Sequence, residues 1–258
     1  MDNYVPNIKR LNGSEVDQLE FAYALAEEKR LDEAIVELKA MLEVSSTSVQ
    51  AHVAIGTIYL LQQRYDEALD CFQTVIQKDA LMPEAVLYAG TVYMQQGKLH
   101  QALQEFEATL DLDPSSAKAY LSIGFVFAQQ MQYDLAEKNF RQALKLDEKM
   151  TLSGVFIAHI YHKQERFEEA ILELNNSIHQ DPDFLISYVI LGSIYLAQQK
   201  YRSAKNAFQK AVDLNQEAYL ARLGLARSLV HLNELESVHQ IFKTLPKFYS
   251  PTSKSKEL

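Results

Sequence analysis

A 34-residue spacing of small residues constrains this sequence more than any other feature. Gly56, Gly90, Gly124 and Gly192 fall on one phase of that period, so four of the eight glycines in the chain occupy it. The other positions on this phase hold alanine, at Ala22, Ala158 and Ala226. A column that admits only glycine and alanine indicates a size limit at a close contact. We therefore predict an array of similar repeats.

Other columns keep the same phase. One is alanine until the last repeat, where Val238 replaces it: Ala34, Ala68, Ala102, Ala136, Ala170 and Ala204. Another holds large apolar side chains: Phe72, Phe106, Phe140, Leu174, Phe208 and Phe242. Together the columns divide residues 15–252 into seven repeats, which begin at Glu15, Val49, Pro83, Ala117, Thr151, Leu185 and Tyr219.

Each repeat contains two amphipathic stretches of about fourteen residues with helical periodicity. A short polar break such as Gln62–Arg64 separates them, which predicts an antiparallel helix pair. Small residues such as Gly90 and Ala102 are expected to let the two helix backbones approach. Pro114 and Pro182 are expected to end two of the second helices, because proline lacks an amide donor. The sequence therefore predicts an all-α fold.

Residues 83–116, PEAVLYAGTVYMQQGKLHQALQEFEATLDLDPSS, resemble the tetratricopeptide repeat (TPR) pattern. Gly90, Tyr93, Ala102 and Phe106 stand where that family has its small and aromatic residues, and Pro114 stands at its closing proline. The resemblance implies an all-α TPR solenoid of about seven antiparallel helix pairs in a right-handed superhelix. It also implies a non-enzymatic scaffold that binds other proteins.

The predicted domain organisation follows the repeats. Residues 15–245 form the solenoid, residues 1–14 are an N-terminal extension, and residues 246–258 are a flexible C-terminal tail rich in Ser, Pro and Lys. Leu25 and Leu38 replace aromatic residues in the first repeat, and the last repeat breaks the alanine column. We interpret both terminal repeats as caps.

The TPR resemblance assigns the lining of a concave groove to the second, fifth, sixth, ninth, twelfth and thirteenth positions of each repeat. The fifth position is aliphatic throughout, so its side chains either line the groove or pack against the next repeat. The other columns carry more apolar surface than a solvated face needs, which indicates binding of an amphipathic helix or an extended hydrophobic peptide. The predicted groove residues are Leu60, Tyr88, Met94, Phe125, Leu152, Phe156, His159, His162, Ile186, Ile190 and Leu196.

His159 and His162 fall on one face of a predicted helix, and Glu165 follows at the same spacing. Three ligands could hold a metal, but exposed polar groups of a groove are the more common explanation for such spacing. We predict no metal and no cofactor. A groove whose affinity depends on pH is the alternative use of these histidines.

Charge and composition narrow the partners. The net charge of −9 repels phosphate backbones, so we expect no nucleic-acid partner. Residues 1–10 lack the apolar core of a signal peptide, and no run approaches the roughly 18 apolar residues of a membrane span. We therefore expect a cytoplasmic protein without direct membrane insertion. The single cysteine, Cys71, is expected to be a partly buried helical residue.

No constellation of nucleophile, base and oxyanion donors is evident, so we predict that the chain is not an enzyme. The preferred function is an adaptor that binds a protein or peptide partner during assembly of a larger complex. The alternative is a self-associating scaffold, and thus a homo-oligomer. Residues 15–48 hold nine acidic and three basic residues, whereas residues 219–258 hold three acidic and six basic ones. This polarity would orient a partner or drive head-to-tail self-association, and ordinary solvated surface is the third interpretation.

Overall fold

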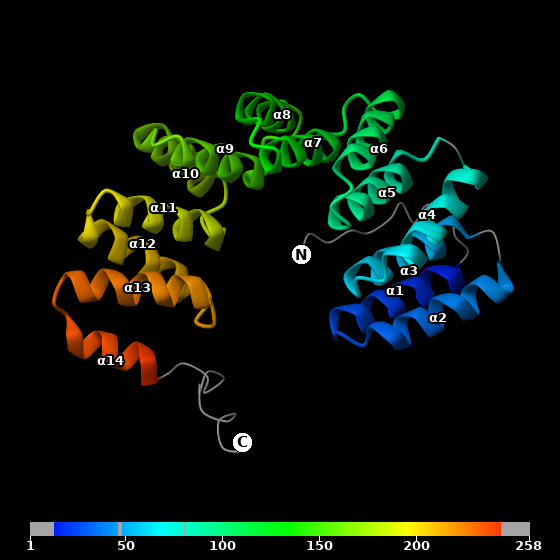
Figure 1. The fold of residues 1–258 in the computed structure, drawn as a ribbon. Coiled ribbons are helices and arrows are strands. Elements are labelled where there is room, and N and C mark those ends of the chain that lie inside the picture. The colour runs from blue at the N-terminus through cyan, green and yellow to red at the C-terminus, as the bar shows by residue number, and fades with distance from the viewer. Residues whose placement is uncertain (1–12, 46–47, 80, 244–258) are drawn as a thin grey trace, which may run out of the picture. The chain divides into compact units, whose positions relative to one another are not determined.

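The computed structural model describes residues 13–45, 48–79 and 81–243, which form fourteen α-helices and no strand (Figure 1). The first helices of the seven pairs are α1 (Gly13–Glu27), α3 (Val49–Leu61), α5 (Pro83–Gln95), α7 (Ala117–Gln129), α9 (Thr151–Lys163), α11 (Leu185–Ala197) and α13 (Tyr219–His231). The second helices are α2 (Leu31–Val44), α4 (Tyr65–Lys78), α6 (Leu99–Leu112), α8 (Tyr133–Leu146), α10 (Phe167–Gln180), α12 (Tyr201–Leu214) and α14 (Leu235–Lys243). The predicted all-α TPR fold is confirmed.

The ends of the chain differ in how far they are described. Helix α1 begins at Gly13, two residues before the first repeat of the sequence, so the end of the predicted N-terminal extension is helical. The rest of that extension and the predicted C-terminal tail lie outside the described residues. None of the described helices has both the length and the apolar character that a membrane crossing requires.

The helices form two compact bodies. The N-terminal body is residues 1–146, with α1 to α8, and the C-terminal body is residues 147–258, with α9 to α14. Within each body the first helix of a pair contacts its own second helix and also the first helix of the next pair, as α3 contacts α5 and α11 contacts α13. We call the side formed by the first helices the inner face of each body.

The glycine of each helix pair makes room for a phenylalanine ring. A Cβ atom on Gly90 would lie 2.6 Å from the ring of Phe106, and one on Gly124 would lie 2.7 Å from the ring of Phe140. Both rings are fully buried. A Cβ atom on Gly90 would also lie 3.1 Å from the Cβ of Glu105, so the small residue admits both the Phe106 ring and the close neighbouring helix.

The turn inside each pair contains one residue in the left-handed region, with φ between 57° and 73°. In the second repeat this residue is Gln63, whose amide donates to the Leu60 carbonyl (3.0 Å), while the Arg64 amide donates to the Tyr59 carbonyl (2.8 Å). This is the Schellman pattern of a helix C-terminus. The Arg64 guanidinium also lies 4.3 Å from the centroid of the Tyr59 ring, so a cation–π contact holds the turn.

Five of the six loops between successive repeats, all but the first, are closed by an aspartate or asparagine. The side-chain oxygen of Asp79 accepts the amide of Leu81 at 3.1 Å, and that of Asp113 accepts the amide of Ser115 at 3.0 Å. The same bond recurs at three further loops, from Asp147, Asp181 and Asn215. These Asx turns explain why loops without proline end their helices as well as those with proline.

Candidate protein-binding face

The fifth position of each repeat is mainly a packing position. Leu19, Val53 and Val155 are 1 %, 0 % and 1 % exposed, because each is covered by its neighbours. Burial this complete favours packing over lining the groove, which are the two interpretations that the sequence leaves open for these residues. Leu223 in the last repeat is different, since 48 % of its surface is exposed.

In the N-terminal body, the predicted groove residues lie on the first helices and are partly buried. The Tyr88 ring stacks on the buried Phe72 ring, with centroids 5.3 Å apart and planes 17° from parallel. Leu60 packs against the same core cluster, and Met94 packs against the next one. Phe125 is also half-buried. Leu60, Tyr88 and Met94 thus contribute to the core, and only the remaining edges of these side chains face outward.

Tyr23, at the ninth position of the first repeat, was not among the predicted groove residues. Its hydroxyl is buried and has no hydrogen-bond partner among the described residues. Burial raises its pKa well above the ordinary range, and the nearby Tyr88 and Glu84 add to the shift. Burial likewise raises the pKa of Tyr88 to about 12. The inner face of the N-terminal body therefore holds phenol groups that stay protonated.

In the C-terminal body, the second position of each repeat forms an apolar column that becomes more exposed along the chain. Leu152 on α9 is half-buried, Ile186 on α11 is 44 % exposed, and Leu220 on α13 is 67 % exposed. Phe156 and Ile190, at the sixth position, are half-buried beside this column. The structure thus gathers the four predicted residues of this group on α9 and α11, and Leu220, which was not predicted, continues the column on α13.

Leu196, also predicted, lies at the twelfth position of α11. It packs against the core cluster that contains Phe208 and Leu225. Its outer edge remains partly exposed. Leu196 therefore stabilises the core with one side, and only its exposed edge is available to a partner.

Sequence reasoning missed four exposed apolar residues on α13. Tyr219, Leu220, Leu223 and Val230 are 62 %, 67 %, 48 % and 52 % exposed. Three of them occupy the second, fifth and twelfth positions, which the same frame assigns to the groove. The signal was therefore present in the sequence, but interpreting the last repeat as a cap concealed it.

The two predicted histidines of α9 are placed differently from one another. His159 is only partly covered and is the more exposed of the two, whereas His162 is half-buried, with its ring centroid 5.9 Å from that of Phe167. Burial lowers the pKa of both rings, and the charge of Lys163 lowers it further. Within the described part of the chain, no three His, Cys, Asp or Glu side chains are grouped so that they could hold a metal ion.

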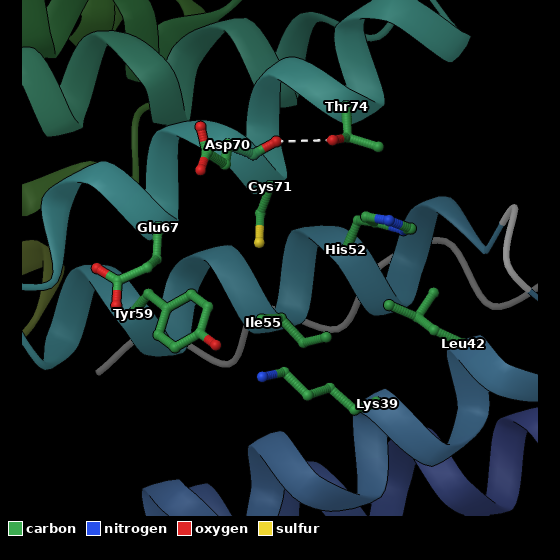
Figure 2. A pocket seen from close by; sticks show the side chains of 9 residues that line it. All are labelled: Lys39, Leu42, His52, Ile55, Tyr59, Glu67, Asp70, Cys71 and Thr74. Carbon is green, nitrogen blue, oxygen red and sulfur yellow. Dashed lines mark hydrogen bonds between the residues drawn. The ribbon is translucent and has the colours of Figure 1, made fainter.

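A separate pocket of about 330 Å³ lies between α2, α3 and α4, away from the predicted groove residues (Figure 2). The Cys71 sulfur points into it, and burial raises the pKa of this thiol to about 11. His52 uses its Nδ1 atom in a 2.8 Å hydrogen bond with the Ser48 carbonyl. A thiol held in its neutral form is a poor nucleophile, so Cys71 serves as a small apolar residue here.

The comparisons with known proteins agree with the geometry. The model of the cilia and flagella-associated protein 70 C-terminal domain family matches residues 16–244. No curated protein sequence matches the chain.

Solved structures show the same fold at low identity. A Parabacteroides merdae tetratricopeptide repeat protein is 20 % identical, with a TM-score of 0.65, over 90 % of this chain and 92 % of its own. PilF of Pseudomonas aeruginosa is 14 % identical, with a TM-score of 0.64, over 86 % and 96 %. A chain of the APC/C complex Cut9–Hcn1 is 17 % identical, with a TM-score of 0.69, over 86 % of the present chain. The match spans only 44 % of the length of that APC/C chain. At such identities the likeness establishes the fold alone.

Proposed function

Because the chain belongs to the family of cilia and flagella-associated protein 70 C-terminal domains, we propose that it is a non-enzymatic scaffold for a partner protein. The TPR fold generally serves as a non-catalytic scaffold for protein–protein interactions. We propose more specifically that the chain binds a hydrophobic or amphipathic segment of its partner on the inner face, during assembly of a larger complex.

The observation that carries this proposal is the apolar column on the inner face of the C-terminal body. Leu152, Ile186 and Leu220 occupy one position on three successive first helices, and two of them are more than 40 % exposed. Exposed apolar side chains that line up across neighbouring elements are typical of binding sites. An amphipathic helix with apolar residues at i, i+3, i+4 and i+7 would cover such a column.

The polar residues of this face favour an apolar segment over a charged one. The ninth positions hold His159, Ser193 and Arg227, and burial holds the pKa of His159 below its usual value. The basic side chains with which some TPR proteins hold C-terminal carboxylates are therefore not gathered on α9 and α11. Neutral histidines are compatible with an apolar partner at neutral pH.

The test uses peptides of about 16 residues, long enough for a helix of four turns, selected from a displayed library against the full chain. Their affinity is measured by fluorescence anisotropy. Ile186→Glu places a charge in the apolar column and should weaken binding about tenfold or more. Leu172→Glu is the matched control, because Leu172 is 60 % exposed on α10, outside the inner face. Equal affinities of the two variants would contradict the proposal.

The proposal includes the location of the protein in the cell. The family description refers to cilia and flagella, and the chain lacks basic character overall, with a net charge of −9. We place the protein in the cytoplasm, in a complex of a cilium or flagellum. Fluorescence imaging of the tagged full chain in ciliated cells tests this, and accumulation in the secretory pathway would contradict it.

A further inference from the structure

The contact between successive repeats has the same composition wherever a core cluster describes it. Leu87 and Met94, at the fifth and twelfth positions of α5, pack in one cluster with Ala119, Ile123 and Val126 of α7. Those three occupy the third, seventh and tenth positions of the following repeat. Val189 and Leu196 of α11 share another cluster with Leu225, at the seventh position of α13. The side chains at the fifth and twelfth positions of one repeat thus pack in the same cluster as the side chain at the seventh position of the next repeat.

At the C-terminal end, the first half of this contact lies open. Leu223 and Val230, at the fifth and twelfth positions of α13, are 48 % and 52 % exposed. The equivalent Leu87 is 9 % exposed, and Met94 is half-buried. Among the described residues, no helix follows α14 to cover α13 as α7 covers α5.

At the N-terminal end, the second half of the contact lies open. Phe21, at the seventh position of α1, is 53 % exposed. The residues at this position in later repeats are buried, as Ile55, Ile123 and Ile157 show with 2 %, 5 % and 0 % exposure. The two ends of the chain therefore expose complementary halves of one kind of interface.

We propose that a second copy of this chain docks its α1 on α13, with Phe21 against Leu223 and Val230. In this arrangement Phe21 takes the place that Ile123 has against Leu87 and Met94. The inference deepens the self-associating alternative for the function and does not depend on partner binding by the inner face. Because the two surfaces differ, the contact is heterologous and adds copies head to tail.

Charge favours this pairing over a contact between two α13 faces. Helix α1 exposes Asp17, Glu20 and Glu27, whereas α13 and α14 expose the basic Arg227 and Lys243 and one acidic residue, Glu236. Asp17 stands at the third position, where later repeats have alanine or serine, so its carboxylate meets the basic end of the other copy. Two α13 faces would instead bring like charges together, which disfavours a symmetric dimer.

The first experiment follows the mass of the full chain by sedimentation from about 1 µM to about 200 µM, where weak protein contacts become populated. The wild type should form larger species as its concentration rises. Phe21→Glu and Leu223→Glu should each weaken association about tenfold or more, because each buries an unpaired charge. Val36→Glu and Leu172→Glu are the controls, since both change exposed residues of second helices, 64 % and 60 % exposed.

Mixing the two variants identifies the geometry. Phe21→Glu keeps its Leu223 face and Leu223→Glu keeps its Phe21 face, so the mixture should form a 1:1 complex that grows no further. A symmetric α13 contact would be lost with Leu223→Glu alone and would not return on mixing, which would overturn the proposal. Phe21→Gln and Leu223→Gln repeat the test if a thermal melt shows that a glutamate variant does not fold.

Two further outcomes would overturn the proposal. One is a wild-type chain that stays monomeric at every concentration. The other is a marked increase in association after residues 246–258 are removed, because that segment, and not a second copy, would then cover α13 in the full chain. Ile186→Glu should leave association unchanged, so a failure here is distinct from a failure of partner binding.

Discussion

At the scale of single residues, the helix pairs are held by matched volumes. The four glycines of the 34-residue column, including Gly56 and Gly124, each face a phenylalanine ring. Where the sequence has Ala22 or Ala158, the second helix has leucine, at Leu38 and Leu174, and all four are buried. The added methyl group is thus offset by a smaller partner, which keeps the interior close-packed.

This matching predicts a compensating pair of substitutions. Gly124→Ala would place a Cβ 2.7 Å from the Phe140 ring and should lower the free energy of unfolding by about 1 to 3 kcal/mol. Phe140→Leu, added to Gly124→Ala, should recover part of that loss, because the pair then equals Ala158 with Leu174. Urea denaturation of the two single variants and the double variant gives the coupling energy. Strict additivity would contradict the size-matching interpretation.

The same site supports a prediction drawn from burial alone. Phe140 is 0 % exposed, so Phe140→Ala should cost about 3 to 5 kcal/mol of unfolding free energy through lost burial and a cavity. A thermal melt that shows no loss would contradict the packing described here. Leu135→Ala, at a residue 42 % exposed on the same helix α8, is the control.

At the scale of helices and turns, the helix pairs were largely predictable from the sequence, but the turns within and between the pairs were not. A strict 34-residue period specifies which residues face inward, so the helix pairs follow from the sequence. The left-handed turn residue is glycine only at Gly97, and elsewhere it is a residue such as Met131 or Glu165, which carries no such signal. Proline marks the helix end plainly only at Pro114 and Pro182, and Asp79 and Asp147 are a weaker sequence signal for the Asx turns that close the other loops.

The turn of the fourth repeat therefore holds a correctable strain. Met131 has φ of 60° and is 72 % exposed. Met131→Gly should raise the free energy of unfolding by about 0.5 to 1 kcal/mol, because glycine adopts this conformation without a Cβ clash. Gly97→Ala, with φ of 73° in the equivalent turn, should lower it by a similar amount. Chemical denaturation measures both, and a shared direction of change would argue against the explanation.

The face of α9 predicts how stability depends on pH. Burial lowers the pKa of His159 and His162 from the ordinary 6.5, so the unfolded chain binds protons there at a higher pH than the folded chain. The stability they contribute is complete above about pH 6.5 and is lost as the pH falls below it. Thermal melts between about pH 7.5 and pH 5 should show this loss, and His159→Gln with His162→Gln should reduce it. An unchanged slope in the double variant would exclude these histidines as its cause.

At the scale of the whole molecule, the ends were harder to predict than the middle. The columns predicted Ile186, Ile190 and Phe156 on the inner face, but they gave no indication that Leu223 is exposed while Leu87 is buried. That difference depends on whether a neighbouring repeat covers the residue. The identity of the residue itself does not indicate this. For the same reason the exposed Phe21 was not recognised as half of a contact.

Charge at the two ends predicts a response to salt. Residues 15–48 carry a net charge of −6 from nine acidic and three basic residues, and Arg227 and Lys243 lie exposed at the opposite end. Raising the salt from about 50 mM to about 500 mM should weaken head-to-tail association, since exposed charges are screened. Sedimentation at fixed protein concentration measures this. Stronger association at high salt would show that the charges do not contribute.

The shared Asx turn at the repeat junctions makes length a modular property of this chain. Removing residues 80–113 would join Asp79 directly to Pro114, and the new joint would read Asp-Pro-Ser-Ser, as the native one at Asp113 does. One whole helix pair would be lost without a change of register on either side. The surface available to a partner can therefore be lengthened or shortened only in steps of one whole repeat.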